Sequence, residues 1–491
     1  MELLLMNMSE PVFYKITTEI PSSYTEKLLE FIYKHYLLPQ KQRFTEFKRE
    51  TTEHASFLTY VLLDTDEGKP LLQVKIKGVT PVEVTLIPIG ASVSTATMEE
   101  AKQDIVIAVQ IFEETARRST LYFAWREGEE IVPETVKKQE KSFNRLFLET
   151  QILFFVVFVI FGMLLFIVVS TLYPEAVWIA PIVLVAVQFF FVFYSSKFIA
   201  RTADWQITQA NPSIHFLEYR LPMDIYGDFK QAPSAEQMLA IKKEIYNEIL
   251  AKQGAIDCEA AHKVFAKHGI VCQPENLVAK KVNVYTIVKK VADKFGFPMP
   301  KIVVSNTMVP NAAASGPSPS RGIVLVTTGI LVQLEEEELV SVLGHEFGHL
   351  KGRDPLILYG LTASEFLLRF YVILPLFPVI FSSFLFIVYF WAVMMIIFFI
   401  AKFFEARADL VSAIKIGQPE VLAGALEKIG FQRLLYERRP SFRLQEWVGL
   451  DAHPPIYFRV RRLQNLKEPV NEKLPLIQSI KDVMLEFLKS I

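Results

Sequence analysis

Cysteine and an excess of either charge are what this sequence most clearly lacks. Its 491 residues include only Cys258 and Cys272, too few for a disulfide framework, and this scarcity agrees with a reducing compartment. Basic residues number 52 against 53 acidic ones, which gives a formal net charge of −1. A chain without a broad basic field gives no indication of a nucleic-acid partner.

The first residues also lack a secretory signal. The sequence opens MELLLM, in which no basic start precedes a long apolar core. We therefore expect the N-terminal domain to stay in the cytoplasm.

Apolar residues, in contrast, are abundant. They make up 51% of the chain and include 40 phenylalanines, which is too apolar for an ordinary soluble protein and indicates a membrane class. Residues 152–173, 176–196, 355–374 and 379–401 are each long enough to cross a hydrocarbon core of ~30 Å as a helix. Basic residues flank both pairs and are absent from the turns, so the positive-inside rule places the flanks in the cytoplasm. We expect a multi-pass helical protein of the cell membrane with about four transmembrane helices in contact with the lipid bilayer.

The chain divides into six predicted segments. Residues 1–130 show alternating strands (12–19, 57–64, 71–77, 83–88 and 121–126) and helices (22–36 and 98–118), which predict an α+β accessory domain. This domain is either a plain folded appendage or a substrate-recognition or regulatory module. The other segments are a linker with the first transmembrane hairpin (131–200), a soluble and largely helical segment (201–297), a strand hairpin with the metal-binding helix (298–354), the second transmembrane hairpin (355–401) and a C-terminal catalytic region (402–491).

Residues 344–352 carry the strongest motif. His345 and His349 are four positions apart, so their rings lie on one face of a helix and can bind one zinc ion. Glu346, beside the first histidine, can reach a water on that metal. This His-Glu-x-x-His pattern is typical of zinc peptidases.

Two histidines need a third ligand that leaves one position open for water. A metzincin would place a histidine six residues after His349, but Pro355 stands there. Glu405 on a later helix is the alternative, and Asp409 lies one turn further on the same face. Asp409 and Asp354 are then suited to orient the histidine rings by hydrogen bonds. Without the neighbouring motif, such a pair would more often be an exposed charged helix face.

The segment before the metal helix is predicted to form a hairpin. Residues 301–305 and 322–328 read as strands, and residues 311–320 read as a loop rich in Gly, Pro and Ser. An exposed strand edge beside the metal helix would bind a peptide through its main chain, with little demand on side chains.

Two further groups keep alternative interpretations. Cys258, His262, His268 and Cys272 have spacings that permit a second zinc site, but two ordinary half-buried cysteines beside solvated histidines fit as well. Glu365 and Arg369 lie one turn apart within a predicted transmembrane helix. They form either a neutralising structural pair or part of a substrate path.

Four pieces of the sequence together resemble a known family: 311–316 (NAAASG), 328–331 (TGIL), 343–349 (LGHEFGH) and 405–409 (EARAD). They are similar to the HtpX-like membrane zinc metallopeptidases, relatives of the CAAX prenyl endopeptidases, over about residues 145–465. The resemblance implies a mainly helical peptidase domain of gluzincin type with a small β-sheet.

The resemblance also implies roles for three residues outside the metal motifs. The family has a late His-Pro followed by an arginine, which residues 453–459 match. His453 would stabilise the oxyanion of the tetrahedral intermediate, and Arg459 would support it or the substrate. Asn311 corresponds to a position near the substrate strand, although Ala313 replaces the usual aromatic residue there. Without the family, a His-Pro-Pro sequence is more often just a turn.

These observations predict a zinc-dependent endopeptidase that cleaves membrane or misfolded proteins at the cytoplasmic face. His345, His349 and Glu405 would hold the zinc, and Glu346 would act as general base on the metal-activated water. Its partners would be protein or peptide substrates and the bilayer. The alternatives are a membrane quality-control scaffold with a vestigial zinc site and a prenyl-protein (CAAX) endopeptidase.

Overall fold

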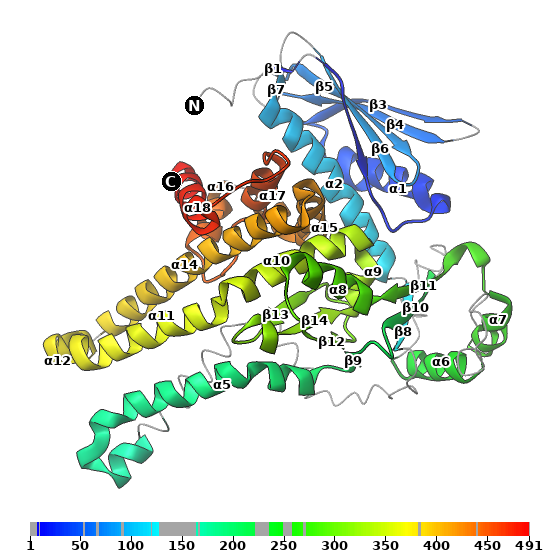
Figure 1. The fold of residues 1–491 in the computed structure, drawn as a ribbon. Helices are drawn as coiled ribbons and strands as arrows, with labels where there is room; N and C mark the ends of the chain where they lie inside the picture. Colours follow the sequence, from blue (N-terminus) through cyan, green and yellow to red (C-terminus); the bar gives the residue numbers. More distant parts are fainter. Residues whose placement is uncertain are drawn as a thin grey trace. The chain divides into compact units, whose positions relative to one another are not determined.

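A computed structural model of the full chain shows two compact units, Met1–Phe123 with Phe216–Lys280, and Ala124–His215 with Lys281–Ile491. The structure describes residues 7–8, 10–52, 55–64, 68–89, 93–118, 120–126, 164, 167–220, 235–248, 258–268, 272–381, 384–437 and 440–490 (Figure 1). Three strands, β8 (Thr120–Arg126), β10 (Ser213–Arg220) and β11 (Leu277–Asn283), form a sheet of order β11-β10-β8. Residues 216–280 thus group with the N-terminal part, whereas the sequence suggested one separate segment over 201–297.

The first unit is built on a five-stranded antiparallel sheet of order β2-β6-β5-β4-β3. Its strands are β2 (Val12–Ile16), β3 (Phe44–Thr51), β4 (Ser56–Leu63), β5 (Pro70–Gly78) and β6 (Val82–Pro88). Strand β3 was not predicted, because it lies at the sheet edge and only Phe44 of its residues is buried. Such a strand shows none of the apolar alternation by which strands are recognised.

Helices complete this unit. The structure forms α1 (Thr25–Phe31) and α2 (Thr95–Arg118), with a 3-10 turn (Ser22–Tyr24) before α1 and a π-helical stretch (Ile32–Leu37) after it. Leu28 of α1 and Ile105 of α2 pack with Val74 of the sheet in one fully buried cluster. The short strands β1 (Asn7–Met8) and β7 (Val93–Ser94) pair with each other. The sheet-rich α+β character of the N-terminal region agrees with the sequence prediction.

Residues 201–297 contain more strand than the sequence suggested. The elements are β9 (Trp205–Ile207), β10 (Ser213–Arg220), α6 (Ala235–Glu248), α7 (Cys258–Lys267), β11 (Leu277–Asn283) and α8 (Val284–Phe295), and β8 (Thr120–Arg126) lies beside β10. Strand β10 is buried at seven of its eight positions. Both its apolar and several of its polar side chains are buried, so the polar residues do not mark an exposed face, and the expectation of a largely helical segment was wrong here.

The possible second zinc site is not formed. Cys272 is disulfide-bonded, so its sulfur is not available as a thiolate ligand. His262 is exposed, and the ring of His268 lies 3.5 Å from a Glu244 oxygen instead. The disulfide also removes the scarcity of cysteine as an argument for a reducing compartment.

The second unit holds a four-stranded sheet of order β13-β14-β12-β9. Strand β12 (Lys301–Ser305) runs parallel to β14 (Ile323–Thr327), and β13 (Ala312–Ser315) runs antiparallel to β14. The predicted hairpin between 301–305 and 322–328 was therefore wrong, since the hairpin is β13-β14 and β13 lies inside the predicted loop. Three alanines have little strand propensity, so only pairing with β14 defines this strand.

In chain order the helices of the second unit are α5 (Ala180–Thr202), α8, α9 (Thr328–Gln333), α10 (Glu336–Gly352), α11 (Asp354–Leu368), α12 (Leu374–Leu376), α13 (Pro378–Phe381), α14 (Leu385–Ile416), α15 (Pro419–Glu437), α16 (Pro440–Val448), α17 (Ile456–Gln464) and α18 (Pro475–Ser490). Helix α10 packs against α8, α11, α14 and α15 of this unit. A π-helical stretch, Arg369–Ile373, continues α11, and the 3-10 turn Pro174–Ile179 precedes α5. A capping box between Glu335 and Glu338 starts α10.

Gly344 and Gly348 set the distance between α10 and α14. A Cβ at Gly344 would lie 2.5 Å from a side-chain carbon of Ile416, and one at Gly348 would lie 3.0 Å from the Cα of Ala408. The glycines of the motif therefore let α14 approach α10 closely enough for Glu405 to reach the histidines.

Two helical segments, Asp354–Leu376 and Leu385–Ile416, are long and apolar enough to cross a membrane. They match the second predicted hairpin and run side by side in Figure 1. Helix α14 continues through both the predicted span and Glu405, because no Gly or Pro interrupts it. Of the first predicted hairpin, 152–173 lies mostly outside the described residues, and the apolar part of α5 is shorter, Ala180–Tyr194. A total of about four spans stays a prediction.

Candidate metal centre and the cavity beside it

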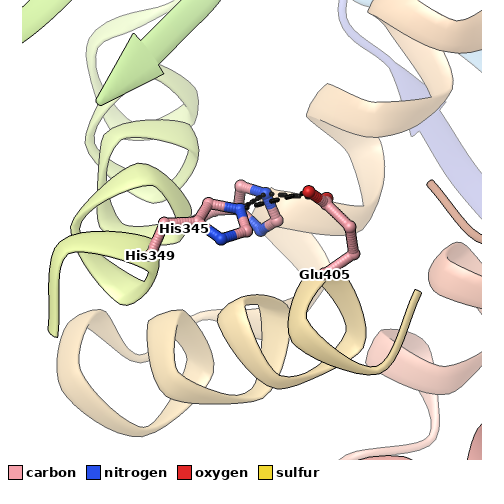
Figure 2. A group of neighbouring side chains, drawn as sticks. All are labelled: His345, His349 and Glu405. Carbon is pink, nitrogen blue, oxygen red and sulfur yellow. Dashed lines mark hydrogen bonds and ion pairs between the residues drawn. The ribbon is translucent and has the colours of Figure 1, made fainter. Parts of the chain in front are cut away.

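Three predicted ligands from two helices meet at one point (Figure 2). His345 and His349 project from α10, and Glu405 projects towards them from α14. The Nε2 atoms of the two rings are 3.2 Å apart. One Glu405 oxygen lies 3.3 Å from His345 Nε2, and the other lies 3.3 Å from His349 Nε2.

These separations fit a single tetrahedral metal ion. Ligand bonds of ~2.0–2.1 Å, as in zinc sites, give a tetrahedron whose edges are about 3.3 Å long. Glu405 Oε2 is buried and receives no hydrogen bond within the described part of the chain. Two imidazoles and one carboxylate form a set that leaves a fourth position open, as catalytic zinc sites do.

Each ligand ring is oriented from its other nitrogen. His345 Nδ1 lies 2.8 Å from Asp409, and His349 Nδ1 lies 2.8 Å from Asp354. Both carboxylates are almost fully buried. The structure thus places the two predicted orienting residues where they direct Nε2 of each ring to the common point.

Arginines hold the two carboxylates in turn. Arg459 on α17 donates two hydrogen bonds to Asp409, at 2.8 and 2.7 Å, and Arg407 on α14 donates to Asp354 at 2.6 Å. The sequence predicted Arg459 near the oxyanion or substrate, whereas its closest contacts are with Asp409, and it lies 3.9 Å from Glu405. Arg407 was missed, although it lies inside the Glu-Ala-Arg-Ala-Asp motif.

The electrostatics of the two rings follow from these contacts. Burial disfavours the charge on His345, but Asp409 and Glu405 outweigh it, so the pKa of His345 is raised above its ordinary value. Burial likewise opposes charge on His349, and Glu405 with Asp354 raises its pKa further.

The side chain of Glu346 reaches from α10 to the edge strand β13. Its Oε2 accepts a hydrogen bond of 3.0 Å from the backbone N–H of Ala314 on β13. Strand β13 pairs with β14 on one side only, and its other side meets Glu346. Asn311, just before β13, donates its backbone N–H to Thr327 Oγ1 at 2.9 Å.

His453 also comes to the site. Its Nε2 lies 3.7 Å from Glu405 Oε2, and its Nδ1 lies 2.8 Å from Asp451. The side chain is 46% exposed, in contrast to the buried ligand His345. It is therefore a half-exposed hydrogen-bond donor beside the metal position. Burial opposes the charge on Asp451, but His453 and Arg433 outweigh it, so the pKa of Asp451 is lowered.

One cavity of about 1010 Å³ connects these residues with the apolar helices. Near the ligands it is lined by Asn311, Glu346 and His453, and it continues along α5, α11 and α14 as far as Arg369 and Phe386. Its walls are mostly apolar, with few polar side chains, as in pockets that bind a ligand by burial and fix it by a few polar contacts.

Comparison with known proteins agrees with this geometry. The model of Peptidase family M48 matches residues 279–468, a range that contains every ligand and orienting residue described above. A protease HtpX homolog from Desulforapulum autotrophicum is 31% identical over 224 residues, which cover 37% of this chain and 68% of that protein. The chain belongs to peptidase family M48.

Other relatives of this M48 chain match shorter parts. Protease HtpX homolog 2 from Methanosarcina acetivorans is 35% identical over 173 residues, 32% of this chain and 56% of that protein. A protease HtpX homolog from Thermodesulfovibrio yellowstonii is 48% identical over 79 residues, 16% of this chain and 28% of its own length. The chain thus spans about half of the length of the first of these relatives and about a quarter of the second. The HtpX-like resemblance read from the motifs is confirmed.

Proposed function

We propose that this M48 protein is a membrane-embedded, zinc-dependent endopeptidase that cleaves membrane or misfolded proteins at the cytoplasmic face. One observation carries the proposal. Three possible ligand side chains whose donor atoms lie within 4.8 Å of one another, the carboxylate of Glu346 and the open edge of β13 all adjoin one cavity that runs on between the apolar helices.

His345, His349 and Glu405 would hold the zinc. When bound, zinc supplies Lewis-acid chemistry, which lowers the pKa of water towards ~7 and polarises a peptide carbonyl. Glu346 then takes a proton from the attacking water as general base and returns it to the leaving amine. Its hydrogen bond from Ala314 N holds the carboxylate at the strand edge, where the scissile bond would lie.

Strand β13 would bind the substrate as an added strand. Its pairing with β14 leaves the other edge open towards Glu346, and an extended peptide can use these backbone groups whatever its side chains are. Asn311 lies at the start of this edge. Alanine side chains on β13 leave room for a range of substrate residues.

His453 and Arg459 would support the reaction in different ways. His453, held by Asp451 and half-exposed at the cavity, can donate to the oxygen that becomes negative during attack. Arg459 acts through Asp409 on the orientation of His345, so it is a positioning residue.

The position of the site supports substrates presented by the membrane. Glu405 lies on the same helix as a candidate span, and His349 precedes the other span by five residues. At 1.5 Å per helical residue, the metal then lies within ~10 Å of one membrane face. Basic residues flank these spans, and this favours the cytoplasmic side.

The variant Glu346→Gln tests the proposal. It removes the general base but none of the ligands, so we expect about one zinc per chain by elemental analysis and a loss of at least ~10²-fold in cleavage of a denatured membrane protein. Zinc binding with unchanged cleavage would contradict the assignment of Glu346. Absence of cleavage by the wild-type protein with zinc bound would favour a scaffold, and cleavage of a prenylated peptide alone would favour a CAAX endopeptidase.

A further inference from the structure

A second polar cluster lies in the same cavity, far from the metal position. Glu365 on α11 accepts hydrogen bonds from Arg369 at 3.1 Å and from Tyr389 on α14 at 2.8 Å. Glu365 and Arg369 both line the cavity that also contains Glu346. The site and this cluster therefore share one continuous space.

The distance between the metal position and the Glu365 cluster follows from helix geometry. Glu365 lies 11 residues after Asp354, which contacts His349, and Tyr389 lies 16 residues before Glu405. At 1.5 Å per residue these separations are about 16 and 24 Å along the helices. An extended chain rises about 3.3 Å per residue, so a peptide from the metal position reaches the cluster after about five to seven residues.

One hydrogen-bond donor of the cluster, Arg369 Nε, has no acceptor within the described part of the chain. Both oxygens of Glu365 are hydrogen-bonded, and its charge is balanced by Arg369. The Nε of Arg369, in contrast, is buried and makes no hydrogen bond within the described part of the chain. An unsatisfied buried donor is costly, so a group that enters the cavity and accepts a hydrogen bond from Arg369 would be favoured there.

We propose that Arg369, held by Glu365 and Tyr389, is a substrate subsite that binds a neutral hydrogen-bond acceptor. The acceptor is a side-chain amide or an unpaired backbone carbonyl in an otherwise apolar segment, five to seven extended residues from the scissile bond. The balanced charge of the cluster selects a neutral group, because a further carboxylate would lie unpaired among apolar walls. The inference rests on the proposed function and adds a specificity that β13, which contacts only backbone, does not supply.

Paired substrates test this subsite in nanodiscs. Each carries the same cleavage sequence and an apolar arm in which Asn or Leu stands at one position, four to nine residues from the scissile bond. We compare the wild-type protein, the double variant Glu365→Leu/Arg369→Leu and the control Thr362→Val. The double variant replaces the pair together, which avoids leaving one buried charge alone. Thr362 lines the same cavity, but its hydroxyl donates to its own helix at 2.9 Å.

The readout is the ratio of kcat/KM for the Asn and Leu substrates, in which any general loss of activity cancels. For the wild-type protein we expect a ratio of about ten, the effect of one hydrogen bond to a charged donor, with its maximum at five to seven residues. The double variant should give a ratio near one, and Thr362→Val should keep the wild-type ratio. The same Asn preference should appear in peptide binding to zinc-loaded Glu346→Gln protein, which does not depend on turnover.

Two results would overturn the subsite: a wild-type ratio of one at every position, in cleavage and in binding, or a double variant that keeps the wild-type preference. A short peptide that ends three residues from the scissile bond is too short to reach the cluster. Its cleavage therefore tests the proposed function without the subsite. If the wild-type protein leaves that peptide intact while binding still prefers Asn, the peptidase assignment fails and the subsite stands.

Discussion

Each ligand histidine belongs to a chain of three residues. His345 contacts Asp409, which Arg459 holds, and His349 contacts Asp354, which Arg407 holds. The arginines come from different helices, α17 and α14. Because each ring is fixed by a charged pair behind it, the metal position depends on residues that would never touch the metal.

The variant Asp409→Asn should weaken metal binding. An amide orients His345 less strongly than a carboxylate and does not balance Arg459, so we expect the affinity for zinc to fall about 10–100-fold. Competition with a chromogenic chelator measures this. Asp482→Asn is the matched control, because Asp482 on α18 forms a similar ion pair with Arg462 on α17, at 2.8 Å. Equal zinc affinity in both variants would show that Asp409 has no orienting role.

The elements around the site differ in how strongly their own sequence specifies them. Helix α10 has a capping box, acidic residues in its first turn and a left-handed Arg353 at its end, so local sequence defines it well. Strand β13 has no such signals and depends on its register with β14. The part that would touch substrate is therefore the part that local sequence defines least.

The variant Ala314→Pro should block cleavage without loss of zinc. Proline removes the N–H that Ala314 donates to Glu346, but an edge strand tolerates proline where its N–H points away from the sheet. We expect cleavage to fall about 100-fold with zinc content unchanged, measured by peptide hydrolysis and elemental analysis. Ala314→Gly, which keeps the N–H, should retain most activity. Full activity in the proline variant would exclude β13 as the substrate strand.

The variant Gly344→Ala should destabilise the contact between α10 and α14. The added Cβ would lie 2.5 Å from Ile416 and 2.6 Å from Ser412 Oγ, an overpacking that commonly costs about 1–3 kcal/mol. Gly424→Ala is the control, because no atom lies within 4 Å of its new Cβ, and alanine favours a helix interior. Unfolding in detergent should separate the two variants, and equal stability would contradict the close-packing role of Gly344.

In the molecule as a whole, the site and the candidate spans form one unit, and the N-terminal sheet forms another. The M48 match covers residues 279–468 and leaves the five-stranded sheet outside. A role for that sheet in substrate recognition or regulation stays a prediction.

Metal loading of the whole protein should depend on pH. The pKa values of His345 and His349 are raised above the ordinary 6.5 when no metal is present, because the attraction of Asp409, Asp354 and Glu405 outweighs burial. The metal-free site therefore keeps its protons to a pH above 6.5, and zinc binding must release them. We expect the apparent zinc affinity to fall on lowering the pH from 8 to 6.5, by about tenfold per pH unit for each proton released. Titration at fixed ionic strength measures this, and a flat profile would contradict the raised pKa values.

The sequence by itself determined which side chains gather at the candidate metal centre and much of the helical framework. His345, Glu346, His349, Glu405 and Asp409 could be found because helical spacing fixes which side chains share a face, whatever the rest of the fold does. The second hairpin of apolar helices could be found for a similar reason, since length and hydropathy are local properties. The spacing around Cys272 was equally regular, yet Cys272 is disulfide-bonded, because spacing alone does not distinguish a metal ligand from a disulfide.

Only the tertiary structure decided which contacts complete the site. That β13 is the edge strand, that Arg407 and Arg459 hold the two carboxylates, and that the cavity continues to Arg369 all depend on pairing between distant segments. Strands β3 and β10 were missed for the same reason. The edge strand β3 has only one buried residue, β10 buries polar as well as apolar residues, and pairing with distant strands defines both.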